Sequence, residues 1–201
     1  ADQAERREDR KGAYYVAIIE KKGRPTPAVV AEIVPEIVKS FPWPKSMRWG
    51  YGKLRWVRPL HSILCLLDGK PVPFEVDGIK SGKVTRGHRF LAPKPFSVKN
   101  FADYKKKLRE AYVLLDGEDR AARILKDARA LAAKQGLTLV EDEALLAENA
   151  GLTEWPVVLM GAFDESFLAV PPEVLSTAMK AHQKCFSLRD GQGKLANRFI
   201  L

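Results

Sequence analysis

The sequence predicts an α+β (mixed α/β) fold: a mixed, largely antiparallel sheet with packed helices, plus a short N-terminal strand–helix segment. Segments with helical spacing of apolar residues are interspersed with short β-branched and aromatic runs along the chain. Several neighbouring strand segments are joined by tight turns, and such connections form antiparallel pairs. The 201 residues are 46% hydrophobic and 29% charged, which is an ordinary globular balance and excludes a disordered or fibrous chain.

The N-terminal part predicts one strand and one helix. The first ten residues are densely charged and are typical of a frayed helix end, whereas residues 13–20 are apolar and aromatic and predict a strand. Thr26 can cap a helix that has Pro27 at its first position. Pro35 lies inside that helical pattern and should kink or divide it.

A module boundary is expected at residues 41–46, where two prolines stand within three residues. Residues 1–44 are then the remnant of an N-terminal module, and residues 45–201 form one α+β domain that is truncated at its C-terminal end. The sequence has no initiator methionine, and it stops inside an apolar run. We therefore expect the chain to be a piece of something longer.

The middle of the chain predicts hairpins. Residues 54–68 are expected to form one long strand, or two strands bent at Pro59. A turn at residues 68–70 joins them to a partner strand at 72–79. Further short strands are expected at residues 83–90 and 95–98.

Helices become more frequent after residue 100. Asn100 can cap a helix that runs to about Tyr112, and its expected buried face consists of Phe101, Tyr104, Leu108 and Ala111. A longer helix over about 117–135 ends at Gly136. The remaining elements are expected as a strand at 137–140, a helix at 141–151, a strand at 155–163, a helix within 171–186 and a final hairpin.

The familiar catalytic and metal-binding motifs are missing from the sequence. It has no Gly-rich phosphate loop, no His-Glu-x-x-His, no Cys-x-x-Cys and no Gly-x-Ser-x-Gly. The three histidines are widely separated, so we expect no metal site. Cys65 and Cys185 lie far apart and are expected to be reduced core thiols, which fits a cytoplasmic protein. A catalytic Cys–His pair, Cys185 with His182 or Cys65 with His61, stays open as an alternative.

No segment is apolar enough to span a membrane, and the start is not a signal peptide.

Positive charge is concentrated in one third of the chain. The net charge is +9 and the pI is about 9.6. Residues 45–110 carry 16 basic and 5 acidic side chains, against 8 and 7 before them and 10 and 13 after them. Such a concentration predicts a phosphate-bearing partner. The alternative is a solvated, lysine-rich face that serves solubility.

The densest candidate site is TRGHRF at residues 85–90. Arg86 and Arg89 flank a Gly-His pair, guanidinium groups bind phosphate in a bidentate fork, and an exposed His88 or Phe90 can stack on a base. In the alternative interpretation Phe90 lies in the core, His88 is bonded internally, and the arginines pair with acidic residues such as Asp77.

Two further segments supply candidate RNA-binding residues. Residues 47–59 interleave basic and aromatic side chains, among them Arg48 and Arg55, although an amphipathic strand explains the pattern as well. Residues 179–186 place Lys180 and Lys184 on one helical face beside His182. Lysines near a helix C-terminus also complement its dipole, so the phosphate clamp is one interpretation of two.

Five segments together resemble the β subunit of bacterial-type glycyl-tRNA synthetase, the form built from separate α and β chains. They are PKSMRWG at 44–50, RWVRPLHSILCLLDG at 55–69, GHRF at 87–90, EWPVVLMGAFDESFLAVPPEVL at 154–175 and MKAHQKCF at 179–186. The resemblance extends over essentially all 201 residues in the expected order. Trp56, Ser62 and Cys185 differ from the family's usual residues, and the family's opening segment and its second half are absent.

The resemblance implies a division of labour between subunits. In this family the β subunit handles RNA, whereas ATP and glycine are used on the α subunit, so no cofactor is expected in this chain. The region is similar to the editing-type domain of the phenylalanyl-tRNA synthetase β subunit. No amino acid smaller than glycine exists to be rejected by size, so the resemblance implies no catalytic residue here. The implied partners are tRNA(Gly) and the α subunit, with neither DNA nor a membrane.

Three hypotheses result. The first is tRNA binding and positioning, or subunit architecture, during ATP-dependent glycyl-tRNA formation. The second is a scaffold for assembly of the α and β subunits that RNA never touches. The third is a vestigial aminoacyl-tRNA deacylase, for which His88, His182 and Cys185 are the candidate groups.

Overall fold

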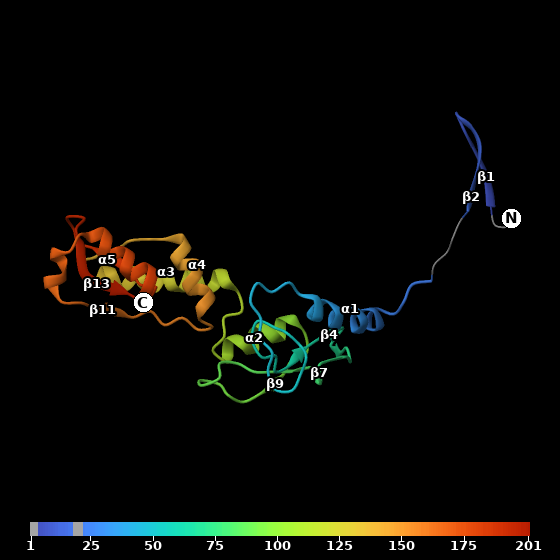
Figure 1. Ribbon diagram of the computed structural model, residues 1–201, viewed down its shortest axis with the longest axis horizontal. Helices are drawn as coiled ribbons and strands as arrows, with labels where there is room; N and C mark the ends of the chain where they lie inside the picture. The colour runs from blue at the N-terminus through green and yellow to red at the C-terminus, as the bar shows by residue number, and fades with distance from the viewer. Residues whose placement is uncertain (1–3, 18–21) are drawn as a thin grey trace. The chain divides into compact units, whose positions relative to one another are not determined.

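Helices and short strands alternate along the chain, which confirms the predicted mixed α+β fold (Figure 1). The computed structural model describes residues 4–17 and 22–201. Within these residues every strand pair except one is antiparallel. The chain divides into an N-terminal unit, residues 1–82, and a C-terminal unit, residues 83–201. The domain boundary expected near residue 44 stays a prediction.

The N-terminal unit begins with a hairpin. Strand β1 (Ala4–Asp9) pairs antiparallel with β2 (Gly12–Ala17), and Arg6 lies opposite Tyr15 in the register. The frayed helix expected for the first ten residues is therefore wrong over Ala4–Asp9, because these residues pair with β2, and residues 1–3 lie outside the described ranges. The strand expected at 13–20 is confirmed as far as Ala17, and its last residues lie outside the described ranges.

Helix α1 (Thr26–Ser40) follows as predicted, with Pro27 in its first turn. Pro25 occupies the cap position, so Thr26 is the first helical residue rather than the cap. The helix continues through Pro35 and does not divide there. Its half-buried side chains recur at helical spacing and include Val30, Val34 and Val38.

Short strands complete the N-terminal unit. They are β3 (Ile63–Leu64), β4 (Leu66–Leu67), β5 (Lys70–Pro71), β6 (Glu75–Val76) and β7 (Ile79–Gly82). Both forms expected over 54–68, one long strand or two strands bent at Pro59, are wrong, because only β3, β4 and an isolated bridge between Met47 and Trp56 form there. The partner strand expected at 72–79 is wrong as well, because β4 pairs with β5 and residues 75–80 form a hairpin of their own. The β4–β5 and β6–β7 hairpins turn at Asp-Gly pairs whose four φ angles are all positive, as a type I′ turn requires. Strand β3 pairs parallel with β7.

The C-terminal unit opens with β8 (Val84–Thr85), which pairs with β9 (Phe96–Ser97), and with helix α2 (Phe101–Glu110). The expected Asn100 cap is confirmed, since its side chain accepts the Asp103 N–H at 2.9 Å. Leu108 is buried as predicted. The burial expected for Phe101 is wrong, because 71% of that residue is exposed.

A four-stranded antiparallel sheet forms the centre of this unit, in the order β10–β12–β13–β11. Its strands are β10 (Thr138–Leu139), β11 (Met160–Ala162), β12 (Phe186–Arg189) and β13 (Leu195–Ile200). Helices α3 (Gly117–Lys134) and α4 (Glu143–Leu152) pack on it, as the sequence predicts. The core they share contains Ile124, Ala128, Ala132, Leu139, Leu145, Ala150, Phe186, Leu188 and Ile200.

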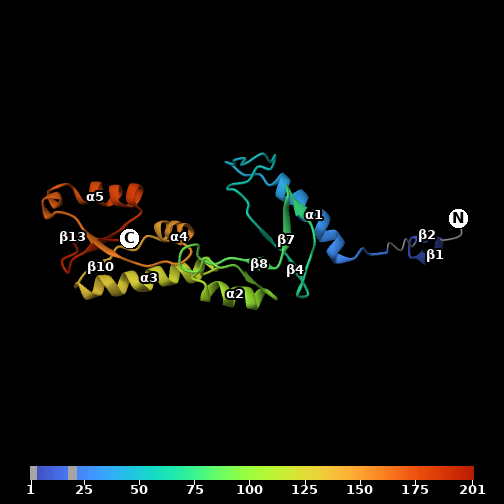
Figure 2. The same ribbon diagram turned by 90° about the horizontal axis from the view of Figure 1, so that it is seen from below.

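The other side of the sheet carries shorter helical turns. They are η1 (Glu165–Ala169), α5 (Pro172–Ala178) and the π-helical turn η2 (Met179–Gln183). Figure 2 shows α3 and α5 on opposite sides of β10 and β13. Lys184 ends η2 in the left-handed conformation, with φ of 57°, so the chain turns sharply into β12. The helix expected within 171–186 therefore ends in a π turn and not in regular α-helix.

Candidate nucleic-acid interface

The basic loop, residues 86–91, is the first part of the connection between β8 and β9, and it contains three of the residues that the sequence singles out, Arg86, His88 and Arg89. Its backbone is fixed at the C-terminal end of α2, where the His88 N–H donates to the Ala111 carbonyl at 2.9 Å. The strand expected over 83–90 is confined to β8, since the chain leaves the strand conformation at Arg86.

Gly87 is required by this close approach. A Cβ atom at this position would lie 2.3 Å from the Ala111 Cβ and 2.5 Å from its carbonyl oxygen. Both distances are far below van der Waals contact, and one of the two atoms belongs to the backbone. Glycine therefore allows the loop to lie directly against the end of α2.

His88 holds the loop from within. Its Nδ1 accepts the backbone N–H groups of Phe90 at 3.3 Å and Leu91 at 3.2 Å, and its carbonyl accepts the Ala92 N–H at 2.9 Å. The ring is half-buried. The internal hydrogen bonding that the sequence left as an alternative is thus present, and it shapes the loop that presents the arginines.

Arg86, Arg89 and Phe90 point outward from this loop. Phe90 is 80% exposed, so its core alternative is wrong, and the Arg89 guanidinium carbon lies 5.9 Å from the centre of its ring. No ion pair between described residues includes either arginine. The sequence does not decide whether Phe90 is exposed or buried. Its position next to Arg89, in a segment that also contains Arg86 and Gly87, was the available indication that it belongs to the candidate site.

The N-terminal unit contains the candidates Arg48 and Arg55. Both are exposed, and the Arg55 Nε donates to the Ser46 hydroxyl at 3.1 Å. The bridge between Met47 and Trp56 brings the two ends of this segment together. An aromatic cluster lies beside it, formed by Phe41, Trp43 and Trp56 with ring centres 4.6–5.6 Å apart. Trp56 is half-buried, in keeping with the amphipathic interpretation.

Lys180 and Lys184 are paired with carboxylates of the α4 segment. Lys184 Nζ lies 2.8 Å from Glu148, and Lys180 forms an ion pair with Asp142, the cap of α4. The two lysines therefore do not form a free clamp on one helical face. His182 is exposed and lies at the edge of a largely apolar cavity of about 900 Å³.

Cys185 lacks the environment of an activated nucleophile. The residue is buried, and its thiol donates to the Gln183 carbonyl at 3.4 Å. Burial raises the pKa of this thiol, so it is protonated at neutral pH. Since the thiolate is the reactive form, the hydrolytic hypothesis gains no support from Cys185.

Acid is expected to weaken the attachment of η2 to α4. The Lys180 ammonium, together with the backbone N–H of Leu145, holds the pKa of Asp142 below its ordinary value. A lowered folded-state pKa means that the stabilisation is present above the unfolded-state pKa of about 3.9 and is lost as the pH falls through the folded-state value. The measurement is the free energy of unfolding in urea, determined at a series of pH values from 7 to 2.5. Asp142→Asn keeps a good helix cap but removes the charge, so the free energy of unfolding of this variant should depend less on pH below pH 4. Identical pH dependence in the variant and the unchanged protein would contradict the pairing.

Within residues 4–17 and 22–201, no group of three or more His, Cys, Asp or Glu side chains is arranged to hold a metal ion. None of the helices in these ranges is long and apolar enough to cross a membrane.

Comparison with known proteins identifies the family. A family model described as "Glycyl-tRNA synthetase beta subunit" matches residues 1–201. The glycine–tRNA ligase β subunit of a Ruegeria species is 54% identical over 203 residues, which cover 99% of this chain and 30% of that protein. The corresponding subunit of Cereibacter sphaeroides is 53% identical, with 99% and 29% covered. That of Paracoccus denitrificans is 54% identical over 193 residues, with 94% and 28% covered. The chain thus spans somewhat under a third of these curated relatives, and it belongs to the glycyl-tRNA synthetase β subunit family.

Proposed function

We propose that this region contacts tRNA(Gly) through the basic loop, residues 86–91, while the complete synthetase joins glycine to its tRNA. The observation that carries the proposal is an exposed Phe90 beside two arginines, Arg86 and Arg89, that have no carboxylate partner among the described residues. Arginine binds phosphate oxygens in a bidentate manner, and an exposed aromatic ring stacks on an unpaired base. In this proposal the ligase acts in the cytoplasm, and ATP and glycine are used on its α subunit.

The charge distribution supports the same proposal. Residues 83–110 of the C-terminal unit carry 9 basic and 2 acidic side chains. Phosphate contacts release counterions, so a basic surface of this kind gains affinity for RNA at low salt. Arg48 and Arg55 in the other unit are further candidate contacts. Lys180, His182 and Lys184 also remain candidates, although both lysines would first have to leave their carboxylates.

The region is also proposed to retain the architecture of the editing-type domain of the phenylalanyl-tRNA synthetase β subunit without its hydrolytic activity. Two findings favour the loss of activity: the thiol of Cys185 stays protonated, and its only hydrogen bond among the described residues is to a backbone carbonyl. The proposed task is therefore binding and positioning rather than covalent chemistry.

Replacing Arg86 and Arg89 together with alanine should weaken tRNA(Gly) binding by the full α/β enzyme and reduce its salt dependence. If each arginine contacts one phosphate, the slope of log K against log salt should fall by roughly 1.4–1.8. Filter binding between 50 and 300 mM KCl measures this slope. Phe90→Ala is expected to lower the affinity by about 1–3 kcal/mol per stacked base and to leave the slope unchanged.

The matched control removes Lys134 of α3 and Lys194 of the turn between β12 and β13, two exposed lysines, which changes the net charge equally. This variant should keep most of the slope, because neither lysine belongs to the loop or to the end of α2 that holds it. A double arginine variant that binds and aminoacylates tRNA like the unchanged enzyme would remove the loop from the interface.

A scaffold function is the second candidate, because Phe90 and Leu91 are adjacent apolar side chains that are 80% and 54% exposed. Such a pair also suits a contact with the α subunit. Analytical ultracentrifugation of a Phe90→Ala, Leu91→Ala enzyme distinguishes the two functions. Loss of α/β assembly indicates the scaffold, whereas intact assembly with weakened tRNA binding indicates the RNA contact.

A further inference from the structure

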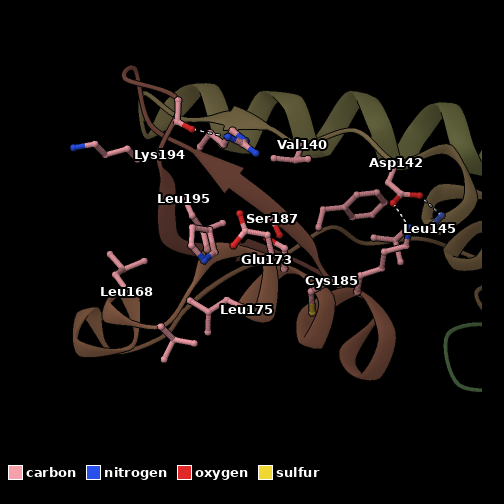
Figure 3. Close-up of a pocket in the computed structure, with 17 residues that line it drawn as sticks. Val140, Asp142, Leu145, Leu168, Glu173, Leu175, Cys185, Ser187, Lys194 and Leu195 are labelled. Carbon is pink, nitrogen blue, oxygen red and sulfur yellow. Dashed lines mark hydrogen bonds and ion pairs between the residues drawn. The ribbon is translucent and has the colours of Figure 1, made fainter.

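A second cavity lies between α5 and the sheet, on the side away from α3 (Figure 3). Its volume is about 640 Å³, which falls within the usual range for small-molecule sites. It is lined by residues of β12, β13, α5 and the segment before α4. The cavity belongs wholly to the C-terminal unit, and the basic loop contributes nothing to it.

Most of the lining is apolar. Leu145, Leu168, Val170, Leu175 and Leu195 contribute their side chains, and Cys185 adds its thiol. Ligand pockets combine such a surface with a few polar groups that fix the orientation of the bound molecule. The apolar part therefore suits a hydrocarbon body rather than a sugar or a free phosphate.

Ser187 supplies one polar group. It lies on β12 between Phe186 and Leu188, which belong to the opposite core, so strand alternation directs its side chain to the cavity. The residue is only 8% exposed, and no side-chain hydrogen bond between described residues uses its hydroxyl. A hydroxyl at the surface of the cavity without a protein partner is a binding group available to a ligand.

Glu173 supplies the second polar group of the lining. Figure 3 shows its carboxylate directed from α5 toward the strand that carries Ser187. No ion pair between described residues includes this carboxylate. A negative group on an apolar surface favours a cation in its vicinity.

The other charged side chains of the lining bond to neighbouring groups of the protein or point away from the cavity. Lys180 is paired with Asp142, and the Arg189 guanidinium donates to the Gly193 carbonyl at 2.7 Å. Figure 3 shows the Lys194 ammonium pointing away from the cavity. Among the described residues, Glu173 is therefore the carboxylate of the lining without a cationic partner, whereas Asp142 has one.

We propose that this cavity binds a small molecule with a primary ammonium group on an apolar body. The ammonium lies at the Glu173 carboxylate and the Ser187 hydroxyl, and the apolar body lies against the leucines of the lining. The proposal depends on the cavity alone, so it holds whether or not the basic loop binds tRNA.

Isothermal titration calorimetry of the full-length β subunit tests the proposal with three probes of equal shape: 4-phenylbutylamine, 4-phenylbutanol and 4-phenylbutyrate. The amine should bind at least tenfold more tightly than the alcohol, and the carboxylate should bind least. Glu173→Gln should reduce the affinity for the amine at least tenfold while leaving that for the alcohol unchanged. Ser187→Ala should weaken both.

The matched control is Glu165→Gln, which removes a carboxylate of η1 that does not line the cavity and should leave all three affinities unchanged. Both glutamates are exposed, so neither substitution disturbs the core. No binding of the amine, equal binding of amine and alcohol, or full binding of the amine by the Glu173 variant would each overturn the proposal.

Discussion

Replacing Gly87 with alanine is expected to displace the basic loop and to weaken tRNA binding at least as much as the loss of both arginines. The added methyl group would lie 2.3 Å from the Ala111 Cβ and 2.5 Å from its carbonyl oxygen. Because the backbone of α2 ends there, the loop must move and the hydrogen bond from His88 to Ala111 must lengthen or break. Overpacking of this kind costs about 1–3 kcal/mol.

The measurement is tRNA affinity of the full α/β enzyme together with hydrogen exchange of the loop amides. The affinity for tRNA(Gly) should fall on the order of tenfold to a hundredfold, because the loss of hydrogen bonds to charged groups has an effect of this size. Gly151→Ala is the matched control, because nothing lies within 4 Å of a Cβ at that helical position. An unchanged affinity for the Gly87 variant would show that the position of the loop does not matter for binding.

Replacing Leu188 with alanine should have the largest effect on the stability of the C-terminal unit. The side chain is fully buried in the core that the sheet shares with α3 and α4. Its truncation removes apolar burial and leaves a cavity, which together cost about 2–5 kcal/mol. Hydrogen exchange on peptides of α3 and β12 measures the loss, because it follows this unit separately from the rest of the chain.

Leu152→Ala provides the comparison, since 69% of that leucine is exposed. Its effect should stay within about 0.5 kcal/mol. Similar losses of protection in the two variants would contradict the assignment of Leu188 to the core. The ordering of the two effects tests the packing of the sheet independently of any function.

Elements with local signals were predictable from the sequence. Asn100 caps α2, and α3 and α4 lie where helical spacing and acidic first turns place them. The Asp68-Gly69 turn follows from its residue types, and the Asp77-Gly78 turn carries the same signal within residues 72–79, which were expected as one strand. These features depend on a few neighbouring residues, so no tertiary information is needed.

Elements that depend on distant partners were not predictable. The charged residues of β1 form a strand only because β2 pairs with them. Residues 155–163 contribute only Met160–Ala162 to the sheet, because strand length depends on where β13 runs. Phe101 begins α2 at a helical spacing that suggested burial, but the packing of the unit leaves it exposed.

The candidate site likewise contains features that neighbouring residues predict and features that depend on distant residues. The sequence identifies the basic loop through the density of arginines around Gly87. It does not show that Lys180 and Lys184 meet carboxylates of α4, because Asp142 and Glu148 are more than 30 residues away in the chain. Nor does it decide whether Phe90 is buried, which depends on the fit of the loop against Ala111.

Hydrogen–deuterium exchange of the full α/β enzyme, with and without tRNA(Gly), tests the central claim most directly. The account predicts slower exchange over residues 86–91 when tRNA is present, and no such change in the double variant Arg86→Ala, Arg89→Ala. Unchanged exchange across this loop at saturating tRNA would contradict the claim that the basic loop contacts RNA.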